Sequence, residues 1–394
     1  MIAAIRSYRI IIPVVVILLI STFAITANWG GVFDVFASAG IVSGSSAGQT
    51  RDPWGVDKES SSFVMPASPF AGITVNTLVD ENNAGADCSL REAITAANTN
   101  AAYGGCTAGS GTDTITVSVA GTLTLTSALP AITSDMTIDG GSQAGFIVSG
   151  NNLYHPFTVT GGATIYVTIT RMTITNGLVS SWPGGGCIGA SNATLIVSGV
   201  TIDSCTATSS NNGGAISTSN ASLTVEDSQI TNNRTTSGST NGGGIYVQGP
   251  AFVMTNSLVS GNHVAEGASG GNGGGMYLGT YQPSRLENVT VSSNTTGAGG
   301  NGAGINLNSG TYRLSNVTLS GNSGAGQGGG LANTASATIR NSTIADNTVT
   351  AAQYNGGGGG IQNGGTQIQL SQTTFLTAAT LILSTVRRSK IRPR

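Results

Sequence analysis

The chain has 394 residues, of which 59 are glycine, while charged residues make up only 8% and aromatic residues 5%. Hydrophobic residues reach 39%, too many for a disordered polymer, and glycine shows no Gly-X-Y period, so a collagen is excluded as well. Residues 10–386 carry 8 basic and 17 acidic residues without a basic stripe, which argues against a nucleic-acid partner. Because helical surfaces normally carry Glu and Lys, this composition predicts an all-β chain.

Residues 1–39 have the features of an export signal. Two arginines precede an apolar stretch from Ile10 to Ala27, and small residues follow it. Cleavage after Ala27 and cleavage after Ala39 both fit. The alternative is an uncleaved anchor, since Ile10 to Ala27 spans 18 residues and just reaches bilayer length, and this segment would then be the only membrane contact. We expect a secreted or cell-surface protein.

Residues 40–71 are rich in Ser, Gly and Pro without periodicity, which predicts a flexible linker. Within them, Gly44 to Gly48 matches the G-x-S-x-G nucleophile elbow. That chemistry needs a strand before the serine and a helix after it, and the pattern provides neither. We therefore interpret the match as linker composition.

The pattern changes at residue 72, where alternation predicts a half-buried strand over 72–79 and a helical period predicts a helix over 89–98. Ser89 and Glu92 form a capping box at the start of this helix. The helix has one narrow apolar stripe, formed by Leu90, Ile94 and Ala97.

Residues 114–375 are repetitive, and each later repeat contains a glycine-rich block followed by a block that ends in asparagine. The glycine blocks end at Cys187, Ile216, Ile245, Met276, Ile305, Leu331 and Ile361, in steps of 29, 29, 31, 29, 26 and 30 residues. The second blocks end at Asn233, Asn262, Asn294, Asn322 and Asn347. A third column lies six residues before these asparagines, at Asp227, Asn256, Asn288, Asn316 and Asn341.

These columns have a common physical cause if each repeat is one coil of a parallel β-helix. Strands of a few residues cannot bury a face alone, but coils stacked one strand spacing apart, about 4.8 Å, bury them against their neighbours. Identical asparagines then lie in register and can hydrogen-bond up the stack, while glycine supplies the positive φ that sharp corners require. We expect these asparagines to be structural.

The hexapeptide from Cys88 to Ala93 resembles the signature of the CSLREA domain, which precedes right-handed parallel β-helices in secreted bacterial proteins. The block Gly213-Gly214-Ala215-Ile216 is similar to the GGA-I repeat of polymorphic outer membrane proteins, which are adhesins; their F-x-x-N repeat has Ile, Val or Leu here in place of Phe. The resemblance implies a pectin-lyase-like superhelix, a single-stranded right-handed parallel β-helix, with a cap over 72–113. We expect the Leu90, Ile94 and Ala97 stripe to cover the first coil, because an open end exposes core side chains and strand edges.

Four cysteines form two pairs, each 18 residues apart: Cys88 with Cys106, and Cys187 with Cys205. An exported protein can oxidise them, so each pair is a disulfide candidate, with free buried thiols as the alternative. The repeat places Cys187 at the inward apolar position and Cys205 at the position of the ladder asparagines. Neither pair has C-x-x-C spacing, and we predict no metal site and no cofactor.

Catalysis on this fold would need clustered ionisable groups on one face. Between residues 150 and 370 there are six acids, five arginines and no lysine. The repeat places Glu226 and Glu287 in one outward column, two coils or about 10 Å apart, with Thr255 between them. That separation slightly exceeds the range of inverting glycosidases. Glu226 and Glu287 are therefore weak catalytic candidates, and a solvated face is the favoured interpretation.

Tyr246 and Tyr277 occupy one outward column on adjacent coils. Their rings could form a platform for a sugar, or could simply stack on each other. Residues 376–394 form an atypical basic tail, which suggests truncation or a frameshift. The favoured function is an exported binding protein, such as an adhesin that binds a polysaccharide or cell-surface glycan. The alternative is a polysaccharide lyase or glycoside hydrolase.

Overall fold

The structure is a computed structural model, and it describes residues 72–141, 145–237, 239–265, 270–350, 358–376 and 381–383. The predicted export signal (1–39), the predicted linker (40–71) and most of the basic tail lie outside the described residues. Among the described residues, no helix is both long enough and apolar enough to cross a membrane.

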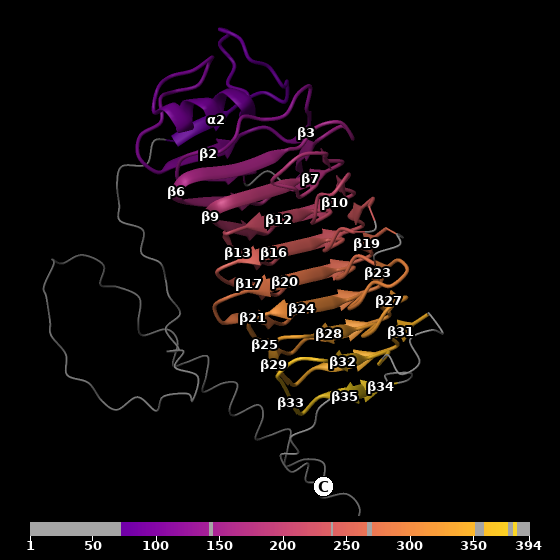
Figure 1. The fold of residues 1–394 in the computed structure, drawn as a ribbon. Helices are drawn as coiled ribbons and strands as arrows, with labels where there is room; N and C mark the ends of the chain where they lie inside the picture. The colour runs from indigo at the N-terminus through magenta and orange to yellow at the C-terminus, as the bar shows by residue number, and fades with distance from the viewer. Residues whose placement is uncertain are drawn as a thin grey trace, which may run out of the picture. The chain divides into compact units, whose positions relative to one another are not determined.

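The fold is a parallel β-helix, which confirms the predicted all-β class. Its strands form three parallel sheets of 18, 10 and 7 strands, stacked coil upon coil from α2 to β35 (Figure 1). In the first coils of the 18-stranded sheet, one strand represents each coil: β1 (Gly72–Val75), β2 (Asp113–Val117), β4 (Met136–Asp139), β6 (Phe157–Thr170) and β9 (Ile188–Ser198).

Later coils contribute two strands each to this sheet, separated by a bend. These are β12 (Ile216–Ser219) and β13 (Ser222–Glu226), β16 (Ile245–Gly249) and β17 (Phe252–Thr255), β20 (Met276–Thr280) and β21 (Ser284–Glu287), β24 (Ile305–Ser309) and β25 (Thr311–Ser315), β28 (Leu331–Asn333) and β29 (Ser336–Arg340), β32 (Ile361–Asn363) and β33 (Gln367–Ser371), and finally β35 (Leu381–Leu383).

The two smaller sheets complete the coil. The 10-stranded sheet contains β3 (Gly121–Thr124), β5 (Phe146–Ser149), β7 (Thr173–Thr175), β10 (Thr201–Asp203), β14 (Gln229–Thr231), β18 (Leu258–Ser260), β22 (Thr290–Ser292), β26 (Thr318–Ser320), β30 (Thr343–Ala345) and β34 (Thr374–Leu376). The 7-stranded sheet contains β8 (Leu178–Val179), β11 (Thr206–Ala207), β15 (Arg234–Thr235), β19 (His263–Val264), β23 (Thr295–Thr296), β27 (Ser323–Gly324) and β31 (Thr348–Val349).

The inward asparagines form a continuous hydrogen-bonded ladder at the corner between these two sheets. Each residue accepts, through its side-chain Oδ1, the backbone N–H of the ladder residue one coil before it, at 3.0 Å in all four steps. The Nδ2 of that preceding residue donates to the same Oδ1 at 2.8 to 3.0 Å. All five side chains are buried, so the ladder satisfies polar groups that the fold removes from water: Asn233, Asn262, Asn294, Asn322 and Asn347.

The first glycine block is one residue out of step with the predicted register. The block pattern placed Cys187 opposite Ile216, but β9 pairs with β12 through Ile188 and Ile216. Cys187 therefore takes the place of Ala215, a position that the next coil fills with Gly244. The predicted inward apolar place for Cys187 was wrong, because a run of three glycines looks the same when it is shifted by one residue.

The position that Cys187 does occupy faces the asparagine ladder. In a later coil, a Cβ added at the equivalent Gly275 would lie 3.0 Å from Cγ of Asn294. In the coil of β9, Cys187 and Cys205 occupy the corresponding two positions and are joined by a disulfide bond. The backbone N–H of Cys205 donates to Oδ1 of Asn233 at 2.9 Å, so the disulfide stands at the start of the ladder.

The single helix of the described residues, α2 (Leu90–Thr99), packs against β1 and β2 at the N-terminal end of the solenoid (Figure 1). Its capping box is present: the backbone N–H of Glu92 donates to Oγ of Ser89, and Oε2 of Glu92 accepts the backbone N–H of Ser89. The apolar stripe of α2 consists of Leu90, Ile94 and Ala97. All three side chains are fully buried, in the same core cluster as the residues of the first coils.

Two links tie the cap to its surroundings. Cys88 and Cys106 are joined by a disulfide bond. Arg91 forms a salt bridge with Asp80 at 2.8 Å and donates to the backbone carbonyl of Ala128 at 2.6 Å. These links hold the helix to chain segments on both of its sides.

The strand predicted over 72–79 is shorter than expected and ends at Val75. At the next residue, the backbone N–H of Asn76 donates to the carbonyl of Cys88, and Oδ1 of Asn76 accepts the N–H of Cys88. The chain thus leaves the sheet because it pairs with the segment before α2 instead.

The C-terminal coil is less well covered. Ile368 and Leu370 of β33 and Phe375 of β34 are in register with inward residues of the preceding coil, yet all three remain partly exposed. Leu376 is 52% exposed. No described helix covers this end of the solenoid.

Candidate ligand-binding surface

Tyr246 and Tyr277 lie on neighbouring strands of the 18-stranded sheet, where β16 and β20 pair them in register. Their rings are stacked, with centroids 5.3 Å apart and planes inclined by 13°. Both side chains are half-buried. Burial raises the pKa of both phenols, so both rings are neutral at physiological pH.

Each ring of this stack has one face toward its partner and one face turned away. The register continues beyond Tyr246 to Ser217, and beyond Tyr277 to Asn306. Both flanking side chains are short, so no neighbouring ring in the column covers the outer faces of the stack. The hydroxyl of Tyr246 also donates to Oε1 of Gln248 at 2.8 Å, which fixes the orientation of the ring.

A third tyrosine, Tyr281, lies in the bend after β20, four residues beyond Tyr277. Tyr281 is 65% exposed, and its hydroxyl donates to Oδ1 of Asn220 at 2.8 Å. Nδ2 of Asn220 donates in turn to Oδ1 of Asn192 at 2.7 Å. Tyr281 was not predicted from the sequence, because it lies in an irregular bend that no column of the repeat marks.

The loop before β9 covers the N-terminal part of the same column. A Cβ added at Gly189 would lie 2.6 Å from Cγ of Pro183, and Gly189 pairs with Ser217, the residue before Tyr246 in the column. Trp182, joined to Pro183 by a cis peptide bond, is 66% exposed. The loop therefore carries an exposed indole, a residue that the sequence analysis also missed.

His155 lies beneath this loop, since a Cβ at Gly189 would also lie 3.1 Å from its Cε1. Burial lowers the pKa of His155 to about 4. Its Nδ1 lies 3.0 Å from Oγ1 of Thr158. The imidazole is therefore neutral at pH 7 and acts in packing.

The acidic candidates lie on the adjacent face of the sheet, in the register that the repeat predicted. Glu226 of β13 pairs with Thr255 of β17, which pairs with Glu287 of β21. The column continues through Ser315 to Arg340 of β29. Two strand spacings put the two carboxylates about 10 Å apart, beyond the separations typical of retaining and inverting glycosidases.

No group of three or more His, Cys, Asp or Glu side chains that could hold a metal ion occurs in the described part of the chain. Glu226 is half-buried and Glu287 is exposed, so both are accessible to solvent. The geometry brings the two carboxylates onto one face without bringing them together. This arrangement suits a solvated or ligand-contacting face better than a paired acid and base.

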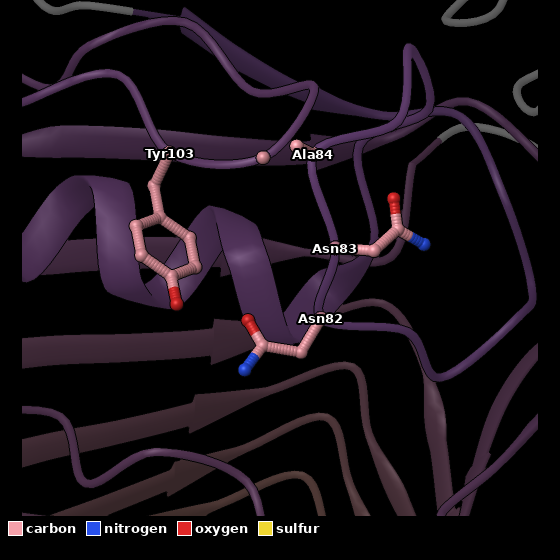
Figure 2. A pocket seen from close by; sticks show the side chains of 5 residues that line it. Asn82, Asn83, Ala84 and Tyr103 are labelled. Carbon is pink, nitrogen blue, oxygen red and sulfur yellow. The ribbon is translucent and has the colours of Figure 1, made fainter.

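The cap contains an open depression of about 270 Å³, lined by Asn82, Asn83, Ala84, Tyr103 and Gly104. Figure 2 shows that Tyr103 and the two asparagines come from separate loops beside α2. The nearby carboxylate of Glu92 is fully buried and accepts the N–H of Asn83 at 2.9 Å, so it is not available to a ligand. The depression offers only amides and one phenol.

A second polar ladder precedes the glycine blocks and was not predicted. In each of its four steps, the side-chain oxygen of an asparagine accepts the backbone N–H of the equivalent residue one coil later, at 2.7 to 2.9 Å. Its members are Asn212, Asn241, Asn272, Asn301 and Gln327. The signal was present in the sequence, because each member directly precedes a glycine block.

Searches of known protein families and of characterised proteins return no match for this chain. Its fold is therefore established by the structure alone.

Proposed function

We propose that this chain is an exported parallel β-helix protein that binds a glycan, at the cell surface or outside the cell, through the outward tyrosine column of its longest sheet. In finer detail, we propose a right-handed, pectin-lyase-like superhelix with a CSLREA-type cap. The hexapeptide from Cys88 to Ala93 and the burial of the helix that it begins support that classification. The two disulfide bonds support an oxidising destination.

The observation that carries the proposal is the stack of Tyr246 and Tyr277. Tyrosine rings have an apolar face and a polar hydroxyl. They therefore suit ligands that present both an apolar C–H face and hydrogen-bonding hydroxyl groups, as sugars do. Gln248 accepts the hydroxyl of Tyr246, and Asn220 and Tyr281 offer further exposed hydrogen-bonding groups in the bends after β12 and β20. The exposed Trp182 belongs to the loop whose Pro183 lies against Gly189 of the same column.

Binding is better supported than catalysis. The two acidic candidates are two coils apart, and the neutral His155 is buried under a loop. A glycan-degrading enzyme remains the second candidate, on the column of Glu226 and Glu287. The variant Glu226→Gln/Glu287→Gln tests it, because loss of any measured depolymerisation would assign that activity to these carboxylates.

The test of the binding proposal is the variant Tyr246→Ala/Tyr277→Ala, measured by retention on immobilised polysaccharides. We expect retention to fall about tenfold or more, because two stacked aromatic contacts are removed. Tyr166→Ala is the matched control, since Tyr166 is an exposed tyrosine on β6, outside this column. Unchanged retention of the double variant would contradict the proposal that Tyr246 and Tyr277 bind a glycan.

A further inference from the structure

The outward side of the 10-stranded sheet carries mostly hydroxyl groups. In its three-residue strands, from β7 to β34, one inward residue lies between two outward positions, which form two columns up the stack. Threonine holds the first column on four consecutive coils, at Thr290, Thr318, Thr343 and Thr374. Serine holds the second column on three consecutive coils, at Ser260, Ser292 and Ser320. We call these residues the hydroxyl face.

The hydroxyl face is regular in both directions. The strands of this sheet pair in step without a register shift, whereas the 18-stranded sheet shifts between Leu278 and Gly279. Neighbours within a column are therefore one strand spacing apart, about 4.8 Å, and the two columns are two residues apart, about 6.6 Å. The Oγ of Ser292 donates to Oγ of Ser260 at 3.1 Å, so hydroxyls on adjacent coils are aligned. The face is thus a two-dimensional lattice of oxygen atoms.

Charge is nearly absent from this side of the solenoid. Asp203 is the one charged residue in the described strands of the 10-stranded sheet. Outward positions of the 18-stranded sheet, by contrast, include Glu226, Glu287 and Arg313. Threonine favours strands in general, but that preference applies to both sheets and does not explain why the charged residues are concentrated on one of them.

The threonine hydroxyls of this face are not used by the protein itself. Within the described residues, the hydroxyls of Thr290, Thr318 and Thr343 have no hydrogen-bond partner. All three side chains are half-buried between their neighbours in the column, and β-branching restricts their χ1 angles. These hydroxyls are therefore held in place, yet they remain available to water.

Fixed hydroxyl groups order the water molecules that they bind, and the oxygen repeats on faces of hexagonal ice lie close to the two spacings of this lattice. We infer that the hydroxyl face binds ice. Its neutrality suits that ligand, because a charged side chain pressed against a solid water lattice would lose its hydration. A sugar fits less well, since the outward positions of the described strands of this sheet carry no aromatic residue. The inference goes beyond the proposed glycan binding and uses a different sheet.

The test measures how much purified protein is taken up into slowly growing ice, and which protein concentration halts recrystallisation of fine-grained ice. It compares wild type with the variant Thr290→Tyr/Thr318→Tyr, whose rings would hold the face away from a flat crystal. We expect wild type to be enriched in the ice fraction. The variant should need an about tenfold or higher concentration to halt recrystallisation, because close contact across the face is lost.

The matched control is Thr224→Tyr/Thr338→Tyr, which changes two half-buried outward threonines in β13 and β29 of the 18-stranded sheet. It should stay within about twofold of wild type in both measurements, because the hydroxyl face is untouched. Tyrosine favours strands, so we expect both double variants to unfold at the wild-type temperature. If the hydroxyl-face variant is less stable than the control, Thr318→Tyr alone makes the same test and should still reduce uptake into ice.

Three results would overturn the inference. The first is wild type that enters ice no more than an inert protein of similar size, and the second is equal activity of wild type and the hydroxyl-face variant. The third is adsorption to crystalline cellulose or chitin through the hydroxyl face without uptake into ice, which would assign the face to a crystalline polysaccharide. Tyr246→Ala/Tyr277→Ala should leave ice uptake unchanged, so failure of this inference and failure of the proposed function are distinguishable.

Discussion

Asn262 shows how a single side chain can serve several polar groups of two neighbouring coils. Its Oδ1 accepts the backbone N–H and the Nδ2 of Asn233, each at 3.0 Å. Its own Nδ2 donates to the carbonyl of Ile230 at 2.9 Å and to Oδ1 of Asn294 at 3.0 Å. The residue is fully buried, so water cannot replace any of these bonds.

We expect Asn262→Ala to lower the free energy of unfolding by about 2 to 4 kcal/mol, because it leaves buried donors and acceptors on both neighbouring coils without partners. Urea denaturation measures this change. The matched control is Asn256→Gly, which removes an exposed amide at a positive φ of 49° and keeps the backbone permissive. Equal losses in the two variants would contradict the ladder's role.

At this scale the sequence allowed the ladder to be predicted, because asparagine recurs at one place in every later repeat. It did not allow the register of Cys187 to be predicted, since glycine runs carry no mark of where the corner falls. Exposed residues such as Trp182 and Tyr281 were missed for a related reason. They lie in loops and bends, where neither the repeat nor burial constrains the residue type.

The element with the clearest individual role is α2. Its buried residues, including Leu90 and Ile94, form one core with the first coils, and the helix covers strand edges that would otherwise be open to solvent. The sequence identified this helix because its signals are local: a capping box and one apolar stripe. Its attachment through Arg91 and Asp80 was not foreseen, because that pair joins the helix to a loop of irregular conformation.

The variant Leu90→Asp/Ile94→Asp should misfold or oligomerise, because two buried carboxylates would separate the helix from the first coil. Size-exclusion chromatography with light scattering, together with thermal unfolding, provides the measurement. Thr99→Asp is the control, since Thr99 is exposed at the end of the same helix. A double variant that remains monomeric with wild-type stability would contradict the capping role.

For the whole molecule, stacking converts a repeat in the sequence into continuous columns on the surface. That is why the column of Glu226 and Glu287 and the tyrosine pair can each be traced from coil to coil. The parallel register was predictable, because every repeat carries the same blocks. Whether an outward column binds a ligand was not predictable, since outward residues are free to vary without affecting the core.

We propose that this solenoid binds a glycan and does not cleave it. The most direct measurement incubates purified protein with a panel of neutral and anionic polysaccharides and records retention and product release in the same samples. We expect retention of at least one polysaccharide, with no new reducing ends and no unsaturated products. Release of either product would contradict the claim and assign the molecule to the glycan-degrading enzymes.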